Sequence, residues 1–480
     1  MKSFTAVCFL LVAATTTFDH RPAFADDFSK RIDSILNNSC GRNASSSVLF
    51  KIIGSGKVIY SKNPDQPLIP ASNMKIITTI AALKILKPWF TFDTVFAHTG
   101  RRSGEAIEGD LVIIGRGNPH LVSEDLWLMA NALRKRGIRR ITGDLVLDDS
   151  YFDEERYPPG WRDSKHRRAF YAPTGALSLN FNSVGISIYP PADGSEKAVV
   201  AIDPRSPYIT LVNSVRTVTG GDTFITIDIK KGEYGSEKII VGGRVAAGSK
   251  EMNYYRHIAD PIRYFGLTFI EFMRDAGIKI DGRVVHARPM TQKPQTVEIF
   301  TYPSRPLLHD LDDMNKFSNN FMAEQIVKTI GAEAVSNPGS FEKGLKKIEE
   351  LLLSWNLEPG SFHLADGSGL SRDNRISSSL LVEILERSHG EWEGGPEFLT
   401  SLAIMGREGS VKGRLTSTEK YIRVKTGTLK SVSSLSGYFP LNSGEIAVFS
   451  MILNGFSCHN GDMLAIQNSI LQELEGYNAH

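Results

Sequence analysis

An apolar segment that opens with a serine and a lysine constrains this chain more than any other stretch. In residues 70–86, Ser72 and Lys75 lie three positions apart, and most of the later residues are isoleucine, leucine or alanine. This pattern predicts a buried helix with Pro70 just before its start. Because residues at i and i+3 share one helix face, the Lys75 amine can reach the Ser72 hydroxyl. Burial of the first turn would lower the pKa of the amine, so that it could take the serine proton.

The same spacing occurs elsewhere, so it is a weak signal alone. Ser340–Lys343 matches it, and there the serine is interpreted as a helix N-cap. Ser417–Lys420 also matches and is interpreted as a surface segment. An ordinary cap with a solvated lysine is therefore the alternative for Ser72.

Two further short motifs follow in the last third of the chain. Ser318 and Asn320 lie where a predicted helix, residues 306–316, meets the next one, so both side chains would project into a cleft. Lys425-Thr426-Gly427 lies in a predicted strand, where glycine lets a substrate backbone approach and lysine supplies charge for a peptide carboxylate. A helix cap would equally explain the first motif, and a solvated edge-strand lysine the second.

Ser-x-x-Lys, Ser-x-Asn and Lys-Thr-Gly, in this order, are the motif set of class A β-lactamases and penicillin-binding proteins. Further matching segments cover most of the chain: Gly109–Pro119, Gly143–Asp148, Gly160-Trp161, Tyr171–Pro173, Asp366–Arg372 and Lys425–Leu429. On these residues the chain resembles the D-alanyl-D-alanine carboxypeptidase/endopeptidase family, the class C low-molecular-mass penicillin-binding proteins (peptidase S13-like). The resemblance implies a multidomain α+β and α/β architecture. Its core would be the penicillin-binding, serine β-lactamase-like transpeptidase fold, an antiparallel sheet flanked by helices, with two nested inserted β-rich domains.

The resemblance also implies roles for the motif residues. Ser72 would be the nucleophile, Lys75 its proton acceptor, and Ser318 the group that passes a proton to the leaving amine. Asn320 would hold the substrate amide. The oxyanion hole would be formed by two backbone N–H groups, those of Ser72 and Thr428.

Two sets of substrate-binding residues follow from the same resemblance. One set would bind the terminal carboxylate: Lys425, Thr426, Gly427 and Thr428. The other set resembles positions that line a pocket for the diaminopimelate side chain: Arg372, Asp163 and Phe170. A surface loop is the alternative for Asp163.

The implied activity is that of a serine DD-peptidase. It would cleave D-Ala-D-Ala termini, D-Ala–meso-diaminopimelate cross-links, or both, through an acyl-enzyme, and β-lactams would inhibit it covalently. No cofactor is implied. A β-lactamase remains an alternative, although the long separation between Ser72 and Ser318 argues against a compact one. A non-catalytic peptidoglycan-binding or β-lactam-sensing module and a general serine esterase also remain open. Two residues, Asn319 and Asn118, depart from the family's usual aspartate.

The ends of the chain bear on its location and organisation. Residues 1–25 combine Lys2, a short apolar run and Ala23-Phe24-Ala25, which predicts a signal peptide and a periplasmic protein without a membrane anchor. The remainder is too long for one core. We expect a penicillin-binding domain from residues 26–90 and 301–480. A second domain would comprise 91–160 and 243–300, with a third, 161–242, nested inside it.

Net charge and cysteine content limit which kinds of partner and which covalent bonds the protein is expected to have. The net charge of +2 gives no reason to expect a nucleic-acid partner. Cys40 and Cys458 would remain after export, and either a disulfide or two free thiols is open. No metal-binding pattern is present in the sequence. Peptidoglycan stem peptides are the expected partners, and the sequence does not determine the oligomeric state.

Overall fold

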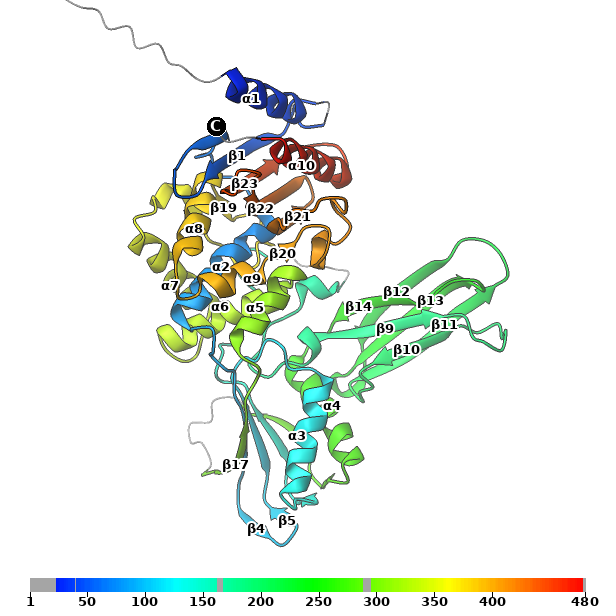
Figure 1. The fold of residues 1–480 in the computed structure, drawn as a ribbon. Coiled ribbons are helices and arrows are strands. Elements are labelled where there is room, and N and C mark those ends of the chain that lie inside the picture. The colour runs from blue at the N-terminus through cyan, green and yellow to red at the C-terminus, as the bar shows by residue number, and fades with distance from the viewer. Residues whose placement is uncertain (1–22, 39, 162–166, 288–294, 478–480) are drawn as a thin grey trace, which may run out of the picture.

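The computed structural model describes residues 23–38, 40–161, 167–287 and 295–477, including the side chains from residue 27 onward. Figure 1 shows a large body that contains both ends of the described chain. A smaller sheet-and-helix unit lies beside this body, and an elongated arm of strands extends from it. The body carries the Ser72, Ser318 and Lys425 motifs, so its construction determines their geometry.

The body is built on a six-stranded sheet that joins the two ends of the chain. Its strands are antiparallel and lie in this spatial order: β2 (Val58–Lys62), β1 (Ser45–Ile52), β23 (Ile446–Asn454), β22 (Val432–Pro440), β21 (Arg423–Leu429) and β20 (Ala403–Ile404). The first two strands form a hairpin, with Phe50 opposite Tyr60. A two-stranded ladder of β18 (Phe362–His363) and β19 (Arg375–Ile376) lies apart from this sheet.

Helices cover both faces of the sheet. On one face, α1 (Ala23–Leu36) and α10 (Asn460–Glu475) pack into one core cluster with the strands, so α10 is a core helix. The other face carries α2 (Met74–Ile85), α5 (Leu307–Lys316), α6 (Asn320–Ala334), α7 (Phe341–Ser354), α8 (Ser378–Gly390) and α9 (Gly395–Ser401). Every residue of α2 from Met74 to Leu83 is buried, because other helices and the sheet surround it. The predicted buried helix is therefore confirmed.

The inserted residues form four further sheets. The smaller unit contains α3 (Ser123–Lys135) and α4 (Pro261–Asp275), together with strands β3 (Thr94–His98), β4 (Arg101–Ser103), β5 (Ala106–Glu108), β6 (Leu111–Gly115), β7 (Arg140–Ile141), β8 (Leu145–Asp148), β15 (Lys279–Ile280), β16 (Val284–Ala287) and β17 (Val297–Tyr302). The arm contains two three-stranded sheets, built from β9 (Ser183–Tyr189), β10 (Val199–Asp203), β11 (Ile209–Val218), β12 (Phe224–Lys231), β13 (Glu237–Ala246) and β14 (Met252–His257).

The strand pairing places the end of the nested domain at a different residue from the one we expected. Residue 242, where we expected the nested domain to end, lies inside β13. β14 then pairs with β9, with Tyr254 opposite Ile186, so the arm continues to His257. The sequence did not reveal this because the partner of a strand depends on contacts between distant segments.

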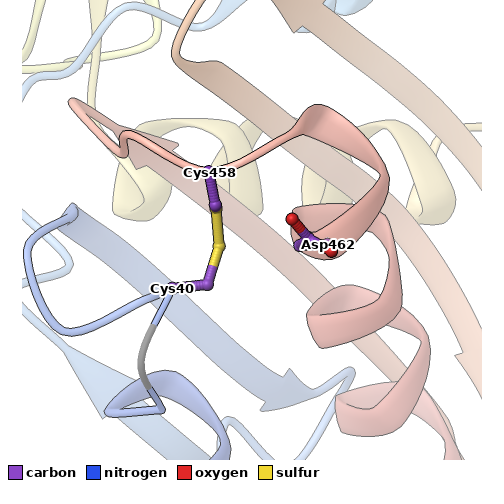
Figure 2. A group of neighbouring side chains, drawn as sticks. All are labelled: Cys40, Cys458 and Asp462. Atoms are coloured by element: carbon purple, nitrogen blue, oxygen red, sulfur yellow. A yellow bond between two sulfur atoms is a disulfide. The ribbon is translucent and has the colours of Figure 1, made fainter.

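A disulfide joins the segment after α1 to the segment before α10. Cys40 and Cys458 are bonded, with their Cα atoms 5.8 Å apart, which settles the question that the sequence left open (Figure 2). The carboxylate of Asp462 lies beside the two sulfur atoms. Because both sulfurs are committed to the bond, neither offers the thiolate that a metal ion would need. The bond therefore links the segments next to α1 and α10, which come from opposite ends of the chain.

The prediction of a signal peptide is not tested by the structure. Residues 1–22 of the predicted signal peptide lie outside the described part of the chain. None of the described helices has both the length and the apolar character required to span a bilayer.

Candidate active site

Ser72 and Lys75 lie where the central helix begins. A single 3₁₀ turn, η1 (Ala71–Asn73), carries Ser72 and leads directly into α2. Lys75 Nζ is 3.0 Å from Ser72 Oγ, as the i, i+3 spacing predicts. The Lys75 side chain is fully buried, so the interpretation as a solvated lysine is wrong.

Two oxygen atoms hold the Lys75 amine from other directions. Nζ donates to Asn320 Oδ1 and to the carbonyl oxygen of Ser368, each at 2.7 Å. Burial lowers the pKa of Lys75 to about 7, although the carboxylates of Asp366 and Glu324 partly oppose this effect. Near neutral pH, the amine can therefore exist both with and without its extra proton.

Ser318 and Lys425 form a second pair. Ser318 lies between α5 and α6 with φ +57°, and Lys425 Nζ donates to its Oγ at 3.1 Å and to Thr426 O at 2.9 Å. Lys425 is fully buried, so it is not a solvated edge lysine. Burial and the charge of Lys75 hold the pKa of Lys425 well below its usual range.

The two residues that depart from the family pattern have local structural contacts. Asn319 is the N-cap of α6, and its Oδ1 accepts from Met322 N at 3.1 Å. The cap is therefore Asn319 and not Ser318, whose hydroxyl faces Lys425. The Oδ1 of Asn118 accepts from His120 N at 2.9 Å. A short oxygen acceptor is all that either position uses here.

Gly427 lets β21 lie directly against the turn that carries Ser72. A Cβ atom at this position would lie 2.9 Å from Ser72 N, 2.7 Å from Pro70 O and 2.2 Å from Ser434 Oγ. The backbone that this glycine accommodates in the structure is that of the protein itself, and its role in substrate approach stays a prediction. On its outer edge, β21 pairs with β20 only at Arg423 and Val424. From Lys425 onward, this edge has no strand partner among the described residues.

Two buried carboxylates shape the glycine-rich loop that follows Asp366. Asp366 accepts four hydrogen bonds of 2.6–2.9 Å, from Gly369 N, Ser371 N, Asn374 Nδ2 and Trp161 Nε1. Glu324 accepts from Gly367 N at 3.2 Å and from Ser368 N at 2.8 Å. With its N–H groups held in this way, the loop directs the Ser368 carbonyl toward Lys75.

Glu324 is a site residue that sequence reasoning missed. It is fully buried, and burial together with the nearby Asp366 raises its pKa to about 8. A signal was present, because Glu324 follows Asn320 by four residues on α6 and must share its helix face. Nothing in the sequence showed that this face lies against the Asp366 loop.

Gly369→Ala is expected to disturb the packing of the glycine-rich loop against the turn that carries Ser72. Gly369 has φ +82°, and an added Cβ would lie 1.8 Å from the carbonyl oxygen of Ala71. We expect penicillin acylation to slow by at least about tenfold, because the turn bearing Ser72 must shift. Gly444→Ala is the matched control, since Gly444 has φ +87° with no atom near the added carbon, and it should cost only about 1 kcal/mol of stability. Equal acylation rates in the two variants would contradict the proposed contact.

The remaining predicted residues lie around this cleft. Asn320 Nδ2 donates to the carbonyl oxygen of Phe170 at 3.1 Å, which brings Phe170 to the site. Arg372 is exposed, and its Nη1 donates to Lys430 O at 3.0 Å. Thr426 Oγ1 lies 2.8 Å from Ser410 Oγ, and Thr428 is exposed.

Asp163, the third residue predicted for the diaminopimelate pocket, lies outside the described residues. Its contribution therefore stays a prediction.

The chain is similar to known proteins over nearly its whole length. The D-Ala-D-Ala carboxypeptidase 3 (S13) family matches residues 28–475. A D-alanyl-D-alanine carboxypeptidase of Actinomadura sp. (strain R39) is 32% identical, with 98% of this chain and 88% of the relative aligned. The crystal structure of penicillin-binding protein 4 (dacB) from Haemophilus influenzae superimposes with a TM-score of 0.79 at 24% identity, covering 93% of this chain and 99% of the other.

A more distant structure has the same fold. The penicillin G-acylated predatory endopeptidase of Bdellovibrio bacteriovorus, in complex with an immunity protein, has a TM-score of 0.52 at 14% identity. It covers 90% of this chain and 92% of its own. At these identities the two solved structures establish the penicillin-binding fold, while the near-complete match to the family profile and the 32% identical relative establish the kinship. The chain therefore belongs to the D-Ala-D-Ala carboxypeptidase 3 (S13) family.

Proposed function

We propose that this protein is an exported, periplasmic serine DD-peptidase that hydrolyses the D-Ala-D-Ala termini of peptidoglycan stem peptides, D-Ala–diaminopimelate cross-links, or both. The observation that carries the proposal is the convergence of two buried lysines on two serines. Lys75 Nζ is 3.0 Å from Ser72 Oγ, and Lys425 Nζ is 3.1 Å from Ser318 Oγ. β-Lactams would acylate the same Ser72 hydroxyl.

The contacts of Lys75 support its role as the proton acceptor. A neutral amine has two N–H groups and one lone pair. Asn320 Oδ1 and the Ser368 carbonyl, neither of which can donate from these atoms, occupy the two N–H groups at 2.7 Å. The lone pair is then left for the O–H of Ser72. Proton transfer leaves an alkoxide that attacks the carbonyl carbon of the penultimate D-alanine.

Bond breaking requires a proton at the leaving nitrogen. As the bond from Ser72 Oγ to the carbonyl carbon forms, the amide C–N bond breaks, and Ser318 would pass a proton to the departing amine. Lys425 Nζ lies beside Ser318 Oγ. With Thr426 and Thr428, Lys425 would bind the terminal carboxylate, whose negative charge favours the protonated amine. The backbone N–H groups of Ser72 and Thr428 would stabilise the oxyanion. Water then hydrolyses the acyl-enzyme.

The decisive experiment offers the purified protein a pentapeptide-bearing muropeptide and a cross-linked muropeptide, and identifies the products by mass spectrometry. Loss of D-alanine from the first would establish carboxypeptidase activity, and cleavage of the second would establish endopeptidase activity. If both remain intact while a fluorescent penicillin still labels the protein, the substrate assignment is wrong. Rapid turnover of the penicillin in place of stable labelling would favour a β-lactamase.

The acylation rate is expected to depend on pH through Lys75. Only the neutral amine can accept a proton, and burial lowers the pKa of Lys75 to about 7. The rate constant for acylation by a fluorescent penicillin should therefore be nearly constant above that pH and fall about tenfold per unit below it. Measurements from pH 5 to 9 would check this. A rate that is still constant at pH 5 would exclude Lys75 as the acceptor.

A further inference from the structure

A pocket of about 500 Å³ adjoins the helix joint that carries Ser318 and Asn320. Its wall includes Ser318, Asn319 and Asn320, so it is continuous with the candidate cleft. The remaining wall is supplied by the inserted residues, chiefly the start of α3, the short 3₁₀ segment η3 (Asn180–Asn182) and the ends of strands β9, β10 and β14. The volume falls in the range of about 300–1,000 Å³ that is usual for ligand pockets.

Backbone strain is concentrated in this wall. Asn180, Phe181 and Asn182 have φ values of +47°, +56° and +49°. Such a conformation is unfavourable for a residue other than glycine, and strain of this kind is concentrated at ligand-binding sites. Asparagine tolerates it better than phenylalanine does, so Phe181 is the residue whose position needs an explanation.

The two asparagines hold this turn in place. The Nδ2 of Asn182, which is fully buried, donates to Pro173 O at 2.7 Å and to Ser178 Oγ at 2.9 Å. Asn180 bonds twice to Ser123, accepting from its N at 3.1 Å and donating to its Oγ at 2.9 Å. The turn presents the Phe181 ring at the pocket wall, edge-to-face with Phe321, the residue after Asn320, with the ring centroids 6.2 Å apart.

The lining combines exposed aromatic rings with oxygen acceptors. Tyr255 is 60% exposed and Phe317 is 70% exposed. Glu124 and Asp203 supply two carboxylates, neither of which has an ion-pair partner among the described residues, and no lysine or arginine belongs to the described lining. Aromatic faces pack against the C–H faces of sugar rings, and carboxylates accept from sugar hydroxyls. A neutral, hydroxylated ligand suits these two carboxylates better than a ligand that carries several carboxylates of its own.

We propose that this pocket binds the glycan portion of the substrate, namely the N-acetylated sugars to which the stem peptide is attached. The inference rests on the proposed DD-peptidase function, because it assumes a stem peptide in the cleft. The stem peptide carries several carboxylates, whereas these sugars are neutral and hydroxylated, so the negative lining selects the sugar end. The inserted units then contribute a wall of a binding site that the body alone lacks.

The test compares two substrates that differ only in the sugar. The values of kcat/KM are measured for a disaccharide-pentapeptide and for the same pentapeptide without sugar, with the wild type, Tyr255→Ala and Glu124→Gln. We expect the wild type to prefer the disaccharide substrate by about tenfold through a lower KM, and each variant to lose most of that preference. Cleavage of the free pentapeptide and acylation by penicillin should be unchanged in both variants.

Phe224→Ala is the matched control. Phe224→Ala removes another exposed ring, 62% exposed on β12 and outside the pocket lining, and should retain the preference. Equal kcat/KM values for the two substrates in the wild type would overturn the proposal. A preference that survives in the combined variant carrying both Tyr255→Ala and Glu124→Gln would overturn it as well. Either result would leave the DD-peptidase assignment intact, whereas failure to cleave both substrates would reject that assignment itself.

Discussion

Ser72→Ala is expected to abolish acylation by penicillin and to reduce D-alanine release by about 10⁴-fold or more. The variant has no oxygen nucleophile where Lys75 can activate one, and the remaining groups can only bind substrate and polarise its carbonyl. Lys75 would keep its other two contacts, to Asn320 and Ser368, so the fold should be unaffected. The measurements are covalent labelling by a fluorescent penicillin and release of D-alanine from a pentapeptide.

The chain offers an internal control for this substitution. Ser417 has the same three-residue spacing to a lysine, Lys420, but it is exposed. Ser417→Ala should therefore label and hydrolyse like the wild type. Penicillin labelling of Ser72→Ala at the wild-type rate would show that another residue is the nucleophile, and the proposed mechanism would be wrong.

Lys75→Met is expected to slow acylation by about 10³-fold or more, and to remove its dependence on pH below 7. Methionine fills a similar volume but offers no lone pair to the Ser72 hydroxyl, so the serine must lose its proton without a base. Two buried acceptors, Asn320 Oδ1 and Ser368 O, would also lose their donor, at about 1–3 kcal/mol each in stability. First-order acylation rate constants separate the two effects, because they do not depend on the folded fraction.

Lys328→Met is the matched control for the loss of a buried lysine. Lys328 is also fully buried, but its Nζ contacts Asp153 Oδ1 and Glu155 O, each at 2.6 Å, outside the candidate cleft. It should lose stability while keeping an acylation rate near that of the wild type. If Lys75→Met acylates within tenfold of the wild type, a different group must accept the serine proton.

Much of the local structure follows from patterns along the chain. The buried α2 helix and the N-cap at Ser340, whose Oγ accepts from Lys343 N at 3.1 Å, are both predicted from periodicity or capping residues. These features depend on neighbours within a few residues, so the sequence displays them directly.

Features that depend on distant segments were missed or misread. The sequence leaves a solvated edge residue as the alternative for Lys425, yet the side chain is fully buried and contacts Ser318 Oγ at the helix joint. The Trp161 indole, from the inserted residues, donates to Asp366 at 2.9 Å, a contact with no local signature. The boundary expected at residue 242 failed for the same reason, since only strand pairing could define it.

The sequence by itself determined which chemical groups the protein has and which of them share a helical turn, because spacing along an α-helix fixes both. It also revealed the family, through short motifs in a set order. Only the tertiary structure decided that Lys75 is buried between two acceptors, Asn320 Oδ1 and the Ser368 carbonyl. It alone also decided that Glu324 and Asp366 shape the loop facing Lys75, and that inserted segments build a pocket beside Ser318. Desolvation and charge act over a few ångströms, and the residues that lie within this distance of Lys75 come from positions hundreds of residues apart in the sequence.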